Sequence, residues 1–209
     1  MKLLLHRYII PLLLLASVKF AAAQVDSSAG YLILNNGATL YGKVEHINVK
    51  SVSPQFYKKI RFTSTDNRRR KYKPEDVAGF KIGNTTYEGF WLHQTSRKIQ
   101  LVNPIYDIDE NNGERYFLKV IKKGSLSHYQ MEWFEQGEST LWWMDLVKKE
   151  NDLFLMRATQ GLLGLKRKAL ADYFKDCPDL VKRINEKELN KVSEVIEFYN
   201  TTCSDENTL

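Results

Sequence analysis

The sequence has few of the residues, and none of the local motifs, on which most enzymes and metalloproteins depend. Its 209 residues include two cysteines and four histidines, and their spacing matches neither a zinc site nor a Cys-x-x-Cys redox pair. Glycine-rich loops for phosphates or dinucleotides and the Gly-x-Ser-x-Gly nucleophile turn are missing as well. We therefore expect no metal and no cofactor. A catalytic triad is recognised only in space, so His93 and His128 stay open as candidates for a hydrolase.

Long apolar stretches are also missing. The longest, residues 8–18, has about eleven residues, whereas a membrane-spanning helix needs about twenty. Lys2 and Arg7 precede this run, and Ala-Ala-Ala follows it. A short basic segment, an apolar run and small residues in this order are typical of a cleaved secretory signal, with a retained membrane anchor as the alternative. We predict a signal peptide at residues 1–23, a periplasmic or extracellular location, and no transmembrane span in the mature chain.

The excess of positive charge is small. The formal net charge is +6, and it falls to +3 once Lys2, Arg7 and Lys19 leave with the signal peptide. This balance gives no reason to expect a nucleic-acid partner.

One strong cluster of positive charge stands out, the run Arg68-Arg69-Arg70-Lys71. A functional interpretation is contact with an anionic envelope component, such as lipid phosphate or an acidic glycan, or with another envelope protein. The structural alternative is a solvated edge strand or hairpin tip, where charges discourage association between sheets.

Residues 24–160 read as a β-rich domain. Short β-prone runs are separated by turn signals, of which Asn36-Gly37 and Gly83-Asn84 are the clearest, and each predicts a hairpin. The segment 103–114 contains a proline and an acidic tract, and we predict an exposed loop there. Along the run 128–133 apolar and polar residues alternate, as in a strand with one buried face.

Residues 161–209 read as a helical segment packed on the sheet. From Leu162 the apolar period changes to about 3.6 residues, which predicts a first helix up to Cys177. Pro178 fits the first turn of a second helix, and a third begins at about Lys191. The fold class is therefore α+β: an antiparallel twisted sheet or partly closed barrel of about eight to ten strands, followed by about three helices.

The two cysteines are predicted to form a disulfide. Cys177 and Cys203 each lie on the apolar stripe of a predicted helix, so both should face inward. In an exported protein such a pair favours a bond. A pair of buried, reduced thiols is the alternative.

Two further groups carry weaker signals. One is a calcium-like tract with glycine one place late for an EF-hand loop, for which an ordinary acidic loop is the preferred interpretation. The other is an aromatic group suited to stacking on sugars, although core packing is the default for aromatics at strand spacing. The tract comprises Asp107, Asp109, Asn111 and Gly113, and the aromatic group comprises Tyr129, Trp133, Trp142 and Trp143.

Three stretches carry a resemblance. They are Gly-Tyr-Leu-Ile-Leu-Asn-Asn-Gly at 30–37, Tyr-Lys-Pro-Glu-Asp-Val-Ala-Gly-Phe at 72–80 and Tyr-Phe-Lys-Asp-Cys-Pro-Asp-Leu at 173–180. With the signal ending in Ala-Gln, the chain resembles a family of uncharacterised exported proteins of Bacteroidota. The resemblance implies export and a bacterial envelope setting. It carries no established activity, so no residue inherits a role.

Two classes of function follow from these observations. The first is a non-catalytic binding, interaction or structural module of the cell envelope or the secreted space. The second is a hydrolase or glycan-active enzyme with an unrecognised active site. An enzyme should place a histidine beside a carboxylate or hydroxyl at the floor of a concave pocket.

Overall fold

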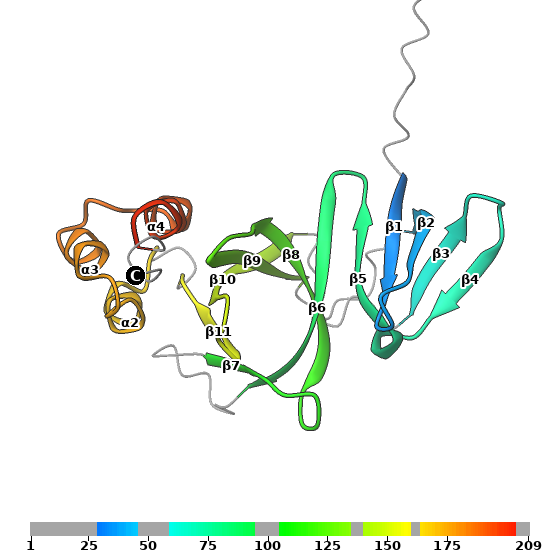
Figure 1. Cartoon of the computed structure of the whole chain (residues 1–209), viewed down its shortest axis with the longest axis horizontal. Helices are drawn as coiled ribbons and strands as arrows, with labels where there is room; N and C mark the ends of the chain where they lie inside the picture. Colours follow the sequence, from blue (N-terminus) through cyan, green and yellow to red (C-terminus); the bar gives the residue numbers. More distant parts are fainter. Residues whose placement is uncertain (1–28, 46–58, 95–104, 135–139, 160–163, 204–209) are drawn as a thin grey trace, which may run out of the picture.

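The chain is elongated and is built in three parts. The computed structural model describes residues 29–45, 59–94, 105–134, 140–159 and 164–203, so the predicted signal peptide at 1–23 lies outside the described residues. Figure 1 shows the N-terminal strands at one end of the long axis, a barrel in the middle and the C-terminal helices at the other end. The described strands belong to one antiparallel sheet of eleven strands.

The first five strands form an open, curved sheet. They lie in the order β4-β3-β2-β1-β5, with β4 at the free edge and β5 next to the barrel. Their bounds are β1 (Ala29–Leu34), β2 (Thr39–Val44), β3 (Ile60–Ser64), β4 (Arg69–Tyr72) and β5 (Val77–Ile82). The hairpin predicted at Asn36-Gly37 is confirmed by the pairing of β1 with β2. Gly37 has a φ of +83°, which residues with a Cβ rarely adopt.

The next six strands close into a barrel. They lie in the order β6-β7-β11-β10-β9-β8, and pairing of β8 with β6 completes the ring. Their bounds are β6 (Thr85–Gln94), β7 (Ile105–Ile108), β8 (Glu114–Lys122), β9 (Leu126–Phe134), β10 (Leu141–Lys149) and β11 (Phe154–Arg157). Strand β6 pairs with β5 as well as with β7 and β8, so it belongs to both the open sheet and the barrel.

Strand β7 corrects one prediction from the sequence. The segment 103–114 was expected to be an exposed loop, but Ile105–Ile108 is a strand that pairs with β6 on one side and β11 on the other. The side chain of Tyr106 is buried in the barrel. Two neighbouring strands and burial override the weak local signal. Residues 109–113 do form the expected connection.

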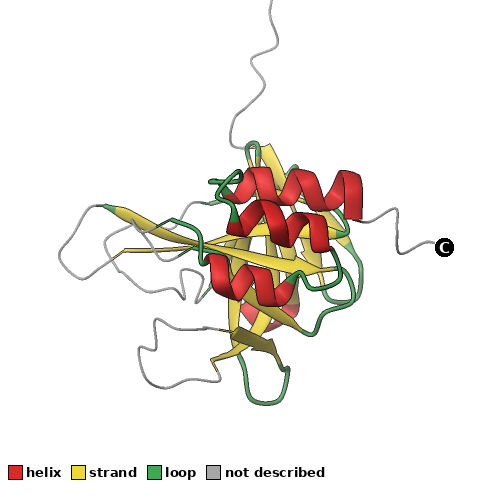
Figure 2. Ribbon diagram, turned by 90° about the vertical axis from the view of Figure 1, so that its left-hand side faces the viewer, coloured by secondary structure: helices red, strands yellow, loops and turns green. Residues whose placement is uncertain are grey.

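Three helices follow the barrel, as predicted. They are α2 (Arg167–Tyr173), α3 (Pro178–Asn185) and α4 (Val192–Phe198), and a π turn at Tyr199–Cys203 extends the last one. Figure 2 shows the helices stacked over one side of the barrel. None of the described helices has the length and apolar content needed to cross a membrane.

The first helix begins later than its apolar pattern predicted. Thr159 and Leu165 form a bridge, and Gly164 has a φ of +75°, so the backbone enters the helix only at Arg167. The predicted start at Leu162 lies outside the described residues. Pro178 occupies the first turn of α3, as expected from its fixed φ and missing N–H.

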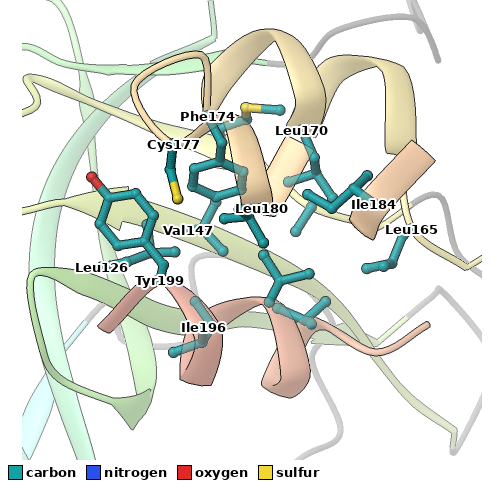
Figure 3. Close-up of a cluster of buried hydrophobic side chains, with 14 of the residues drawn as sticks. Leu126, Val147, Leu165, Leu170, Phe174, Cys177, Leu180, Ile184, Ile196 and Tyr199 are labelled. Atoms are coloured by element: carbon teal, nitrogen blue, oxygen red, sulfur yellow. The ribbon is translucent and has the colours of Figure 1, made fainter. Parts of the chain in front are cut away.

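Three hydrophobic clusters hold these parts together. One lies between the open sheet and the outer face of the barrel, around Leu32 and Phe80. A second fills the barrel interior around Leu118 and Leu146. The third joins barrel and helices, and in Figure 3 the strand residue Val147 points into a group of helix side chains. The open sheet and the helices therefore use different outer surfaces of the same barrel.

Candidate functional site

The basic run lies at the free edge of the sheet. Arg69, Arg70 and Lys71 belong to β4, the last strand, and Arg68 precedes it in the turn from β3. All four residues are exposed. The Arg68 guanidinium forms an ion pair with Asp66, with Nε and Oδ2 2.8 Å apart.

The strand alternation divides this run between two faces of the sheet. Arg70 pairs with Phe62, a buried core residue, so Arg70 lies on the side that faces the core. Arg69 pairs with Thr63 and Lys71 pairs with Arg61, so these residues share the opposite, outer face. The four predicted site residues therefore do not form a single patch.

On the outer face, cations from distant parts of the chain gather. The register sets Lys43 of β2 opposite Thr63, which itself lies opposite Arg69 of β4. Strand β5 adds Lys81, which pairs with Tyr31, and Tyr31 pairs with Tyr41. Side chains of residues paired directly across strands point to the same face. We call this surface the basic face; its cations are Lys43, Arg61, Arg69, Lys71 and Lys81.

Little negative charge balances the basic face. Among the described residues of β1 to β5 and their flanks, the acid on this face is Glu45, whose Oε2 lies 3.9 Å from Nη1 of Arg61. On the neighbouring strand β6, Glu88 pairs with Gly79 on the same face, but it forms an ion pair with Lys123 of the barrel. The Arg61 side chain is 65% exposed, so this ion pair contributes little. Arg61 and Lys71 stand directly opposite each other, which is unfavourable for like charges. An anion bound across these strands would relieve that repulsion.

The two arginines that are not on the basic face line a hollow on the other side of the hairpin. The hollow has a volume of about 350 Å³, and Tyr72 and Asp66 line it together with Arg68 and Arg70. Because Asp66 already pairs with Arg68, this hollow is less positive than the basic face.

His128 does not satisfy the geometric test for an enzyme. Its Nε2 lies 2.9 Å from Oδ1 of Asp145, so it does stand beside a carboxylate. Gln130 donates to the same Oδ1 at 3.0 Å, and Thr159 donates to Oδ2 at 3.3 Å. However, the side chain of Tyr129 lies inside the barrel, so that of its neighbour His128 points to the outside of the barrel wall. His128 is nevertheless only 5% exposed, because other parts of the chain cover it. The group reads as a buried structural network.

The pKa of Asp145 reflects this network. Burial alone would raise the pKa of its carboxyl, but the hydrogen bonds from His128 and Gln130 outweigh burial and lower it. The carboxylate is therefore the stable form, and it ties β10 to β9.

The other histidines are not joined to this pair. His93 is exposed at one open end of the barrel, where β8 begins. His46 lies outside the described residues.

The calcium-like tract is organised by one aspartate. Oδ1 of Asp109 accepts from the backbone N–H of Asn111 at 2.8 Å, and its Oδ2 accepts from the side-chain amide of Asn112 at 2.7 Å. The hydrogen bond from Asn112 is the main reason that the pKa of Asp109 is lowered. The Asp109 carboxylate therefore stabilises the turn between β7 and β8 through these hydrogen bonds. This role agrees with the interpretation of the tract as an ordinary acidic loop.

The other open end of the barrel carries a closed polar network. The Tyr129 hydroxyl accepts from Lys123 Nζ at 2.6 Å and donates to Glu88 Oε2 at 3.2 Å, and Lys123 forms an ion pair with Glu88. Burial raises the pKa of Tyr129, so the phenol stays protonated. The three groups hydrogen-bond to one another and line a cavity of about 410 Å³ at this end of the barrel.

The predicted disulfide is present. Cys177 and Cys203 are bonded, with their Cα atoms 5.7 Å apart, and both side chains lie in the cluster between barrel and helices. The bond links the start of α3 to the π turn that follows α4.

These features define an α+β protein with a closed six-stranded barrel, a positively charged sheet face and a disulfide-linked helical cover. Comparison with family models, with curated proteins and with solved structures found no match for this chain. The geometry of the described residues is therefore the basis of the function proposed below.

The sequence did not reveal the basic face. Lys43 lies 25 residues before the basic run and Lys81 ten residues after it, and each is a single lysine in a β-prone segment. The sequence shows which side chains alternate along each strand, but it does not predict the strand order that brings these lysines together.

Proposed function

We propose that this protein is exported and acts as a non-catalytic binding module that recognises an acidic glycan of the cell envelope through its basic face. One observation carries the proposal: the strand register places five cations and two tyrosines on one outer face of the open sheet. The acids on this face are fewer, Glu45 beside Arg61 and, on β6, Glu88, which is paired with Lys123. Export is supported by the signal-like leader and by the disulfide, which is typical of oxidising compartments.

The chemistry of this face suits a polymer of acidic sugars. Arg61 and Arg69 can each bind a carboxylate, sulfate or phosphate through two parallel hydrogen bonds. Tyr31 and Tyr41 offer rings against which sugar faces can pack, and the Tyr41 side chain is 68% exposed. Neighbouring strands lie about 4.8 Å apart, so the cations form rows that an extended anionic chain can follow.

A membrane surface fits the same charges less well. Proteins that bind lipid headgroups usually add exposed apolar side chains that enter the acyl region. On the described part of the basic face, Tyr41 is the one exposed large hydrophobic residue. A hydrolytic function has less support. His128 is buried against the outside of the barrel wall, away from the cavities. His93 is exposed at the edge of a cavity, and among the described residues it has no hydrogen bond to a carboxylate that would orient it as a base.

The test compares two triple variants of equal charge. Purified protein with its disulfide formed is titrated with polygalacturonate, with neutral dextran and with phosphatidylglycerol vesicles. Changing Arg61, Arg69 and Lys71 to glutamine should weaken binding to polygalacturonate by at least about tenfold, or about 1.4 kcal/mol. The matched control changes three exposed lysines of the helical part, Lys168 in α2, Lys175 in the turn after α2 and Lys182 in α3, to glutamine and should keep most of the affinity.

Three results would contradict the proposal. They are equal loss of binding in both triple variants, tighter binding to the vesicles than to polygalacturonate, and absence of binding to polygalacturonate at low salt. Arg70→Gln gives a finer control, because Arg70 lies on the other side of β4 and its change should matter less than Arg69→Gln. Mass spectrometry of protein recovered after export should show a chain beginning at Gln24 with both cysteines oxidised.

A further inference from the structure

One open end of the barrel forms a concave site that is separate from the basic face. The middle of the barrel is solid, because Leu118, Leu146 and Leu155 are completely buried there. At the end where β8 begins, a cavity of about 410 Å³ opens between the strands, within the size range of small-molecule sites, about 300–1,000 Å³. We call it the Glu114 mouth; its lining includes Tyr106, Tyr116, Met131, Trp133, Met144 and Glu114.

One wall of the Glu114 mouth is aromatic and extends beyond the cavity. Met131 and Met144 pair across β9 and β10 and both line the mouth, so this face of the two strands points inward. Trp133 and Trp142 form the next pair on the same face. Trp142 is 39% exposed. The two indoles therefore stand side by side at the entrance and continue the wall toward solvent.

The opposite wall is polar. Tyr116 and Glu114 follow each other on the inward face of β8, and the Tyr116 hydroxyl donates to Glu114 Oε2 at 3.1 Å. Burial, with the carboxylate of Glu114, raises the pKa of Tyr116 to about 12, so the phenol remains a neutral hydrogen-bond donor. Asn112 and His93 complete this side of the mouth, and the amide of Asn112 is held by Asp109.

This combination selects the class of ligand. Flat aromatic faces pack against the C–H faces of a sugar ring, while a carboxylate, an amide and a phenol bind its hydroxyl groups. An acyl chain would remove the charged Glu114 carboxylate from water without offering it a hydrogen bond, which is costly. An anionic ligand would meet the Glu114 carboxylate, and no lysine or arginine is among the described residues that line the mouth.

We propose that the Glu114 mouth binds a neutral sugar ring, stacked on Trp133 and hydrogen-bonded by Glu114 and Tyr116. The proposal stands apart from the basic face, which takes anionic chains on a different part of the sheet. It also gives a function to part of the aromatic group noted in the sequence: Trp133 and Trp142 face the mouth, Tyr129 is buried inside the barrel, and Trp143 points to the outer face.

The experiment measures binding of four neutral disaccharides, cellobiose, chitobiose, mannobiose and maltose, by calorimetry and by tryptophan fluorescence. Galacturonic acid and lauric acid serve as the anionic and apolar probes. We expect at least one disaccharide to bind in the millimolar range or tighter, with weaker or no binding of both acids. Glu114→Gln and Trp142→Ala should each weaken the disaccharide by at least about tenfold.

Trp143→Ala is the matched control, because Trp143 follows Trp142 on the same strand, is 55% exposed and faces outward. It should leave sugar binding unchanged. Trp133→Ala is added with a check of its unfolding curve, and Trp142→Ala keeps the test decisive if that variant does not fold. The proposal is overturned if none of the four disaccharides binds, if lauric acid binds more tightly, or if Trp143→Ala causes the larger loss. Failure of polygalacturonate binding at the basic face would leave these outcomes unaffected.

Discussion

The side chain of Asn200 pairs with the backbone of Leu126 as another strand would. Its Oδ1 accepts from the Leu126 N–H at 2.7 Å, and its Nδ2 donates to the Leu126 carbonyl at 2.9 Å. Asn200 lies in the π turn after α4, and Leu126 is the first residue of β9. The last helical turn is thereby fixed to a barrel strand through two polar bonds, in addition to the apolar packing around Tyr199.

Replacing Asn200 should detach this contact. Asn200→Ala leaves the partly buried N–H and carbonyl of Leu126 without these partners, which costs about 1–3 kcal/mol in the free energy of unfolding. Urea unfolding followed by circular dichroism measures the change. Thr202→Ala, an exposed position in the same turn, should stay within about 0.5 kcal/mol of wild type. Equal effects of the two variants would show that the Asn200 bonds do not stabilise the fold.

Loss of the disulfide should weaken the helical cover. Closing the loop between Cys177 and Cys203, which are 26 residues apart, is worth about 3.5 kcal/mol in the chain-entropy model. We expect Cys177→Ala combined with Cys203→Ala to lower the unfolding free energy by about this amount. Wild type in reductant should lose a similar amount and the double variant should lose nothing further. A double variant as stable as the oxidised wild type would contradict the expectation.

The features that the sequence predicted correctly are those with local signals. Asn36-Gly37 specifies a turn with its own two residues, and Pro178 marks the start of a helix. The two cysteines are buried and bonded as predicted, although Cys177 lies between α2 and α3 and not on the first helix, which ends at Tyr173. Each signal is contained within a few residues. Local chemistry therefore sufficed for the hairpin, the second and third helices and the disulfide.

The features that it missed depend on pairing between distant segments. The barrel closes because β6 pairs directly with β8, as in the pair Leu92 and Glu114, although β7 lies between the two strands in the sequence. No local pattern specifies that choice. Strand β7 was taken for a loop, since its four residues gain their order from β6 and β11. The Glu114 mouth and the basic face are products of this same register, so neither was visible before the strand order was known.

Arg115 should be a main link between the barrel and the open sheet. Its guanidinium lies 5.4 Å from the centre of the Trp91 ring and 5.5 Å from that of Phe117, and its Nη2 donates to the Val77 carbonyl of β5. Arg115→Lys replaces a flat, two-sided group by a point charge, and we expect a loss of about 1–3 kcal/mol. Arg61→Lys, at an exposed position on the open sheet, is the matched control and should change stability little. Urea unfolding of both variants measures the difference, and equal curves would exclude the proposed role of Arg115.

The Asp145 carboxylate should make stability depend on pH in the acid range. Because the pKa of Asp145 is lowered in the folded state, its contribution is fully present above the unfolded value of about 3.9 and is lost as the pH falls through the folded pKa. Asp145→Asn should therefore be less stable than wild type at neutral pH, and this difference should shrink below about pH 4. Urea unfolding between neutral and acid pH measures both curves. Gln130→Met keeps the carboxylate and its bond to His128, so part of the pH dependence should remain in that variant. A difference between Asp145→Asn and wild type that is the same at every pH would show that the carboxyl group does not titrate as its hydrogen bonds require.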